Sequence, residues 1–268
     1  MMENNQQLRA LFALPPMPSS AGTALFIPEL PPSQAVTGDG EIDAVLWLQS
    51  VVKTGNQVLI DMALESVKRI TTPMKLLEDR YAAHVRKTHP DNVFAVLFAT
   101  MDFGDLEKRA KQAVEKEARK REALSRFGSV EALFAATPAE AACGKALRGL
   151  KRKNGFYDSR QARSRFERHP ALVPATIDDC LYVFEYWERL YVLRSAAVDY
   201  AGDPLQETSE HDSYCFAKMS DVHPRSGAEA IRAFDHMNSC DRLGWSHGPE
   251  VLRNLIASGW AGTGKEAA

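Results

Sequence analysis

The sequence predicts an all-α protein: a compact, bundle-like body of several helices with a proline-rich, extended N-terminal arm. Apolar residues recur at helical spacing through most of the chain, and no segment shows the strict alternation of a half-buried strand. Capping residues and glycine or proline stops flank the periodic segments. The composition, 45% hydrophobic and 25% charged, is that of a globular protein and excludes a disordered, collagenous or coiled-coil chain.

Residues 1–38 are predicted to form the arm. Proline opposes helix and favours extended backbone, and the arm contains Pro15, Pro16, Pro18, Pro28, Pro31 and Pro32. Apolar residues such as Leu11, Phe12 and Phe26 are too frequent for a simple spacer. We therefore expect part of the arm to lie against its own body or against a partner.

Two helices are expected directly after the arm. Apolar residues recur at helical spacing from Glu41 to Val52 and again from Val58 to Val67, and Gly55 between them supplies a C-terminal stop. The boundary between these two helices is therefore expected at the glycine.

Thr72 followed by Pro73 is typical of an N-cap with proline in the first turn. The helix that it opens must end near His89 and Pro90. The short apolar run from Val93 to Phe98 is either a buried strand or a buried helix, because periodicity alone does not separate the two.

The segment 105–127 is predicted to be a long, charged helix, supported by i,i+4 pairs such as Glu115 with Arg119. Ser129 is expected to cap a short helix that ends near Ala136. The run 137–140, Thr-Pro-Ala-Glu, is a capping box with proline at the first helical position.

Thr176 is expected to open the most apolar helix, which must stop before Gly202. An irregular stretch follows, and then short helices at 226–238 and 249–258. We expect a helical domain over 39–170 and an acidic helical region over 171–268, either separate or packed together as one domain.

Charge is distributed unevenly along the chain, although its net value is only −2. Residues 105–168 contain 17 lysine and arginine residues against 9 acidic ones, whereas residues 169–268 contain 8 against 15. Such segregation indicates either a charged partner or docking between two parts of the chain.

The densest basic stretch is the candidate binding site. Basic side chains neutralise phosphates, and the interleaved Phe156, Tyr157 and Phe166 could stack on unpaired bases. Lys145, Arg148 and Arg152 are expected to share one helical face. The predicted nucleic-acid-binding residues are Lys145, Arg148, Lys151, Arg152, Lys153, Arg160, Arg163 and Arg165.

The run from Arg126 to Glu140, RFGSVEALFAATPAE, resembles the lead-in to the helix-hairpin-helix units of DNA repair and recombination proteins. The resemblance covers residues 124–150 and implies a turn whose backbone N–H groups contact a phosphate. It departs from that family at the hairpin, where Gly144 and Gly149 replace the usual Gly-apolar-Gly. The alternative is two short capped helices of an ordinary core.

These observations predict a non-enzymatic nucleic-acid-associated accessory or regulatory protein without a cofactor. One alternative is an adaptor or inhibitor that grips an acidic protein partner. The chain as a whole also resembles accessory proteins of conjugative plasmids. Another is a metal-dependent enzyme built from the scattered C-terminal residues His211, Asp212, Cys215, Asp221, His223, Asp235, His236, Cys240, Asp241 and His247.

No apolar run approaches the length of a membrane span, and the first residues lack the features of a signal peptide. The four cysteines are widely spaced and form no C-x-x-C pair. We therefore expect reduced thiols, no membrane partner and a cytoplasmic location.

Overall fold

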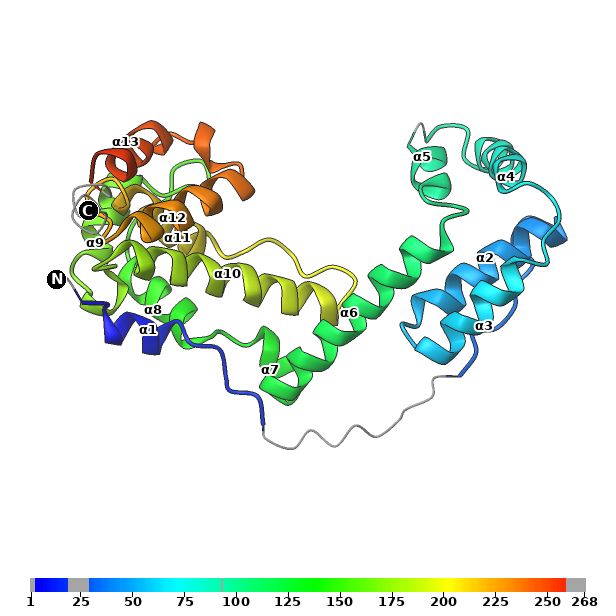
Figure 1. The fold of residues 1–268 in the computed structure, drawn as a ribbon, viewed down its shortest axis with the longest axis horizontal. Coiled ribbons are helices and arrows are strands. Elements are labelled where there is room, and N and C mark those ends of the chain that lie inside the picture. The colour runs from blue at the N-terminus through cyan, green and yellow to red at the C-terminus, as the bar shows by residue number, and fades with distance from the viewer. Residues whose placement is uncertain (1–2, 19–28, 93, 259–268) are drawn as a thin grey trace, which may run out of the picture. The chain divides into compact units, whose positions relative to one another are not determined.

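The computed structural model describes residues 3–18, 29–92 and 94–258, and all regular secondary structure in these ranges is helical. The predicted all-α class is therefore confirmed. The elements, shown in Figure 1, are α1 (Gln6–Leu11), α2 (Gly40–Lys53), α3 (Gln57–Val67), α4 (Met74–Thr88), α5 (Ala95–Thr100), α6 (Leu106–Phe127), α7 (Val130–Phe134), α8 (Pro138–Ala146), α9 (Ser159–Phe166), η1 (Pro170–Leu172), α10 (Ile177–Ala197), α11 (Gln206–Lys218), α12 (Gly227–Ser239), η2 (Arg242–Gly244) and α13 (Gly248–Ser258).

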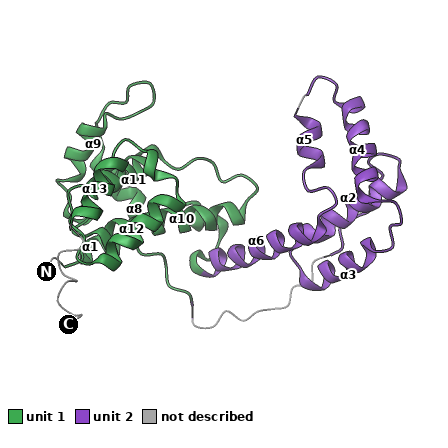
Figure 2. Ribbon diagram, turned by 45° about the horizontal axis from the view of Figure 1, so that its top comes forward, with its two compact units in different colours: residues 1–17, 126–268 green, residues 18–125 purple. Residues whose placement is uncertain are grey.

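The chain divides into two compact units, which Figure 2 colours separately. Unit 1 combines the N-terminal residues up to Met17 with the chain from Arg126 onward, and unit 2 contains residues 18–125. The boundaries fall between residues 17 and 18 and between residues 125 and 126, not near residue 170, where the change in charge suggested a boundary. The basic stretch and the acidic helices that follow it belong to the same unit.

Unit 2 is built around the pair α2 and α3. Their apolar faces pack together with the start of α6, and a second cluster joins α2 to α4 and Phe103. Gly55 ends α2 as predicted, with a positive φ of 67°. A β-carbon at this position would lie 2.8 Å from Glu117 Cβ on α6. Only glycine fits this close approach without strain.

Two local expectations in unit 2 are decided by the structure. Thr72 does not cap α4: the N-cap residue is Pro73, without a side-chain bond, and Thr72 Oγ1 instead donates to the Glu41 carboxylate at 2.8 Å. Of the apolar run from Val93 to Phe98, Val93 lies outside the described residues, and the run is helical from Ala95 onward, in α5. The short α5 buries none of its own residues.

Unit 1 is organised around α10, which packs against α1, α7, α11 and α12. The caps expected in this unit are confirmed. Ser129 accepts from Ala132 N, Thr137 and Glu140 form the full capping box, and Thr176 accepts from Asp179 N. These local bonds fix where α7, α8 and α10 begin.

The expectation of an extended arm over residues 1–38 is wrong for residues 6–11, which form α1. Asn5 caps this helix, and Leu8 and Phe12 are fully buried in unit 1. Arg9 Nε donates to Asp179 Oδ1 at 2.9 Å, which ties α1 to α10. This part of the arm packs on its own body; residues 1–2 and 19–28 of the arm lie outside the described ranges.

The stretch between α10 and α12, expected to be irregular, contains α11. Its buried residues include Thr208, Glu210 and His211 beside Tyr214 and Phe216. α11 contacts α8, α9 and α10, so it forms much of the framework behind the basic stretch.

Candidate functional site

The basic stretch contains a small hairpin over residues 151–157. Lys153 N donates to Phe156 O at 2.8 Å and Phe156 N donates back at 3.1 Å. Asn154 and Gly155 between them both have positive φ, 53° and 85°. This is the two-residue turn that an Asn-Gly pair favours. It leaves the Phe156 side chain 64% exposed at the turn.

The hairpin is not part of a helix, so the expected shared helical face of Lys145, Arg148 and Arg152 is wrong. α8 ends at Ala146, and Gly149 with φ of 79° carries the chain away from the helix axis. Gly144 lies inside α8 rather than in a turn. The resemblance to a helix-hairpin-helix lead-in stays a prediction.

Two of the eight predicted binding residues use their charge within unit 1. Arg152 forms an ion pair with Glu207 and lies 4.7 Å from the centre of the Tyr157 ring. The Tyr157 hydroxyl donates to the same carboxylate at 2.7 Å. Burial alone would raise the pKa of Glu207, but the bonds from Tyr157 and Arg152 lower it below its ordinary value. These contacts anchor the hairpin to α11.

Arg163 behaves in the same way. Its Nη2 lies 2.6 Å from Asp221 Oδ2, and its Nε lies 3.2 Å from Glu167 Oε1. The alternative expectation, docking between the basic part of the chain and the acidic residues 169–268, therefore holds for Arg152 and Arg163.

The other six predicted residues form no ion pair with any described residue. Arg165 is half-buried and the rest are exposed. They extend from the end of α8 through the hairpin to α9 and are Lys145, Arg148, Lys151, Lys153, Arg160 and Arg165. Their charge is therefore available to a ligand.

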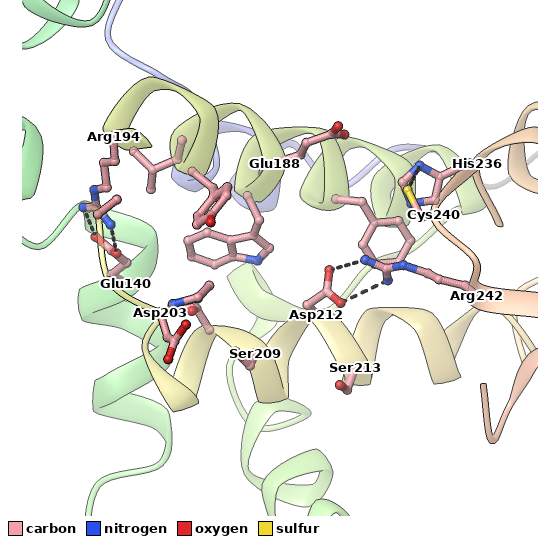
Figure 3. A pocket seen from close by; sticks show the side chains of 18 of the residues that line it. Glu140, Glu188, Arg194, Asp203, Ser209, Asp212, Ser213, His236, Cys240 and Arg242 are labelled. Atoms are coloured by element: carbon pink, nitrogen blue, oxygen red, sulfur yellow. Dashed lines mark hydrogen bonds and ion pairs between the residues drawn. The ribbon is translucent and has the colours of Figure 1, made fainter. Parts of the chain in front are cut away.

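A second site was not found from the sequence: a cavity of about 460 Å³ in unit 1. Its walls come from α8, α10, the segment before α11, α11 itself, and the chain from α12 to Trp245 just after η2 (Figure 3). The lining is mostly apolar and includes the rings of Phe184, Trp187, Tyr191 and Trp245. No pattern local to one helix predicts such a cavity, because its residues come from separate segments.

Ion pairs lie at two places in the cavity wall. Arg194 contacts both oxygens of Glu140, at 2.6 and 3.0 Å, and Arg242 contacts both oxygens of Asp212 at 3.0 Å, one with hydrogen-bond geometry. Figure 3 shows the two pairs. Burial raises the pKa of Asp212, and the charge of Arg242 partly offsets this effect. Arg242 also lies over the rings of Phe184 and Trp245, at 4.3 and 4.7 Å.

His236 and Cys240 lie at one end of the cavity (Figure 3). The imidazole stacks on Phe184 at 5.0 Å, and its Nδ1 is 3.9 Å from Cys240 Sγ. Burial, together with the charge of Arg242, lowers the pKa of His236 to about 4. An imidazole with such a pKa is neutral at pH 7 and a weak base for a thiol.

The C-terminal residues considered for a metal site include two close pairs, His211 with Cys215 and His236 with Cys240, but within the described residues the pairs do not extend to a metal-binding group. In residues 3–18, 29–92 and 94–258, no three His, Cys, Asp or Glu residues are placed to hold a metal ion. His211 and Cys215 belong to the core, and His223 Nδ1 bonds Asn254 Oδ1 at 2.8 Å. Asp212 is occupied by Arg242.

Comparison with known proteins found no matching family model, no similar curated protein and no similar solved structure. Among the described helices, none has the length and apolar character needed to cross a bilayer. Function is therefore inferred from the geometry of the two sites.

Proposed function

We propose that the chain is a non-enzymatic nucleic-acid-associated protein, and that it binds through the hairpin and the ends of α8 and α9. The observation that carries the proposal is the set of six cationic side chains without a carboxylate partner in the described residues. A cation already paired with a carboxylate contributes little binding free energy at a phosphate. An unpaired cation displaces the counterions of the phosphate, and their release favours binding.

Phe156 supports single-stranded nucleic acid as the preferred form. Its ring is 64% exposed at the tip of the hairpin, and Lys151 and Lys153 precede it on the same hairpin. An exposed ring beside cations is the arrangement that stacks on an unpaired base while its neighbours contact the backbone. A base inside a duplex does not offer its face in this way.

The ion pairs of the hairpin and α9 divide the eight predicted binding residues into two groups. Arg152 and Arg163 are occupied by Glu207 and Asp221, so their replacement should affect stability more than binding. The stronger binding candidates are Lys151 and Lys153, which have no such partner among the described residues.

The test is fluorescence anisotropy with labelled single-stranded DNA and RNA, and with duplex DNA, over a range of salt concentrations. Removal of one cation that contacts a phosphate should reduce the slope of log K against log salt by about 0.7 for a single strand. The Lys151→Ala/Lys153→Ala variant should therefore show a slope shallower by roughly 1.4. Phe156→Ala should weaken single-strand binding at least about fivefold with little change in slope.

The control variant is Lys218→Ala/Arg253→Ala, which removes two positive charges from α11 and α13 of the same unit. Its salt slope should match that of the unaltered protein. Absence of binding at low salt, or an equal loss in the control variant, would overturn the proposal.

A second candidate function, a protein-binding adaptor or inhibitor, is favoured by the apolar surface around α5. Phe94, Leu97, Phe98 and Met101 are each 58–67% exposed. Contiguous exposed apolar side chains of this size are typical of protein interaction surfaces. Sedimentation velocity at high salt tests whether the partner is a second copy of this chain. Concentration-dependent assembly that Leu97→Asp/Phe98→Asp removes supports that partner, and a monomer at all concentrations excludes it.

A further inference from the structure

Apart from the basic surface, unit 1 contains a cavity whose lining carries an excess of negative charge. It has four carboxylates, from Glu140, Glu188, Asp203 and Asp212, and two guanidinium groups. Both guanidinium groups are already paired, Arg194 with Glu140 and Arg242 with Asp212. The ring of His236 adds no charge at pH 7 because it is held neutral by burial.

Two carboxylates therefore remain without a cationic partner among the described residues, Glu188 on α10 and Asp203 on the segment before α11. Both side chains are exposed at the edge of the cavity, and Figure 3 labels both. A concave surface lined by one sign of charge concentrates ligands of the opposite sign.

The apolar part of the lining has the chemistry that recognises a flat ligand. Trp187 and Tyr191 come from α10 and Trp245 comes from the segment after η2. Aromatic faces attract both aromatic rings and organic cations. The volume of about 460 Å³ lies within the range of small-molecule sites in proteins.

We infer that this cavity binds a small aromatic molecule that carries a positively charged amine. The ring lies against the aromatic wall, and the amine lies at the acidic edge of the cavity, beside Glu188 or Asp203. Anionic ligands are disfavoured because both arginines of the wall are neutralised by carboxylates. The cavity shares no residue with the six unpaired cations, so this inference does not rest on the proposed nucleic-acid binding.

The test uses three probes with the same ring system: 2-(aminomethyl)naphthalene, 2-naphthalenemethanol and 2-naphthoate. Dissociation constants are measured by ligand-observed NMR at pH 7.5 without nucleic acid. We expect the amine to bind about threefold to tenfold more tightly than the alcohol, and the alcohol more tightly than the carboxylate. Binding of the carboxylate as tight as that of the amine would overturn the inference.

Two variants separate the position of the site from its charge. Ser209→Trp, on the α11 wall, fills the cavity and should abolish binding of all three probes. Glu188→Gln/Asp203→Asn should bring the preference for the amine below about twofold while leaving the affinity for the alcohol unchanged. Persistence of the preference in this variant, or no binding of any probe at about 5 mM, would also overturn the inference.

The matched control is Glu185→Gln/Asp235→Asn. These carboxylates are exposed on α10 and α12 but do not line the cavity. The change in net charge is the same, so an unaltered preference here shows that the effect is local. Circular dichroism of each variant verifies that the helices are retained.

Discussion

Lowering the pH from 7 to 5 should destabilise unit 1 through His211. This side chain is fully buried in α11, and its Nε2 lies 2.9 Å from the carbonyl oxygen of Leu172. Its ring stacks on Phe12 at 5.1 Å and meets Phe166 edge-on at 5.0 Å. Burial among these rings lowers the pKa of His211 from 6.5 to about 4.

The sign of the effect follows from the two pKa values. Below pH 6.5 the unfolded chain takes up a proton at His211, whereas the folded chain does so only near pH 4. Stability is therefore complete above pH 6.5 and falls as the pH decreases toward 4. The loss from this residue between pH 7 and pH 5 is about 2 kcal/mol, and it approaches about 3 kcal/mol below pH 4. His236 contributes in the same direction, because its pKa is also lowered.

The assay is urea unfolding at pH 7 and pH 5, followed by tryptophan fluorescence, for the unaltered protein and for His211→Phe. The variant lacks the bond to Leu172, so it should be less stable than the unaltered protein at pH 7. Because it has no imidazole to protonate at this position, the difference in stability between the two proteins should be smaller by about 2 kcal/mol at pH 5. An equal decrease in stability between pH 7 and pH 5 in both proteins would show that His211 is not the titrating group.

Three further changes test individual contacts by chemical denaturation. Gly55→Ala should cost about 1–3 kcal/mol, because φ is positive and the new methyl group meets Glu117; an unchanged midpoint would contradict this close approach. Glu140→Gln should cost about 3 kcal/mol, since it leaves the Arg194 charge without its partner, and a loss below about 0.5 kcal/mol would show that the pair is not buried. Phe12→Ala should cost about 3–5 kcal/mol, and a small effect would mean that α1 does not pack on unit 1.

The helix boundaries that the sequence predicts well are those fixed by neighbouring residues. Thr137 and Glu140 form a capping box within one turn, and Ser129 and Thr176 each accept from a backbone N–H three residues later. Such bonds depend on local sequence alone, so a local pattern is sufficient to predict them.

The elements that the sequence misses depend on contacts between distant residues. The buried side of α11 includes polar residues, among them Thr208 and Glu210, so its apolar periodicity is weak. The helix α1 is short, and its partner Asp179 lies 170 residues from Arg9 in the sequence. The Asn5 cap is a local signal for α1, but a helix of six residues is too short for apolar periodicity to support it. The start of α11 has no side-chain cap.

The candidate sites were only partly predictable for the same reason. The basic residues can be read from the sequence. The partner of Arg152, however, is 55 residues away, so the sequence does not reveal that the charge of Arg152 is already paired. The cavity needs residues from α8, α10, α11 and α12 at once. A single sequence gives the residue types but not the distances between the helices that carry them, so it does not predict the cavity.

Unit 1 is interrupted in sequence by unit 2, and this order has a consequence during synthesis on the ribosome. The backbone N–H of Asn5, at the start of α1, donates to an Asp179 oxygen 174 residues later. At ordinary translation rates, that carboxylate emerges about 10–35 s after Asn5 does. Unit 2 is complete by then, whereas the buried side chains of α1 must wait for their binding site. The nascent N-terminal segment, with Leu8 and Phe12 exposed, is therefore the part of the chain that a ribosome-associated chaperone would be expected to bind first.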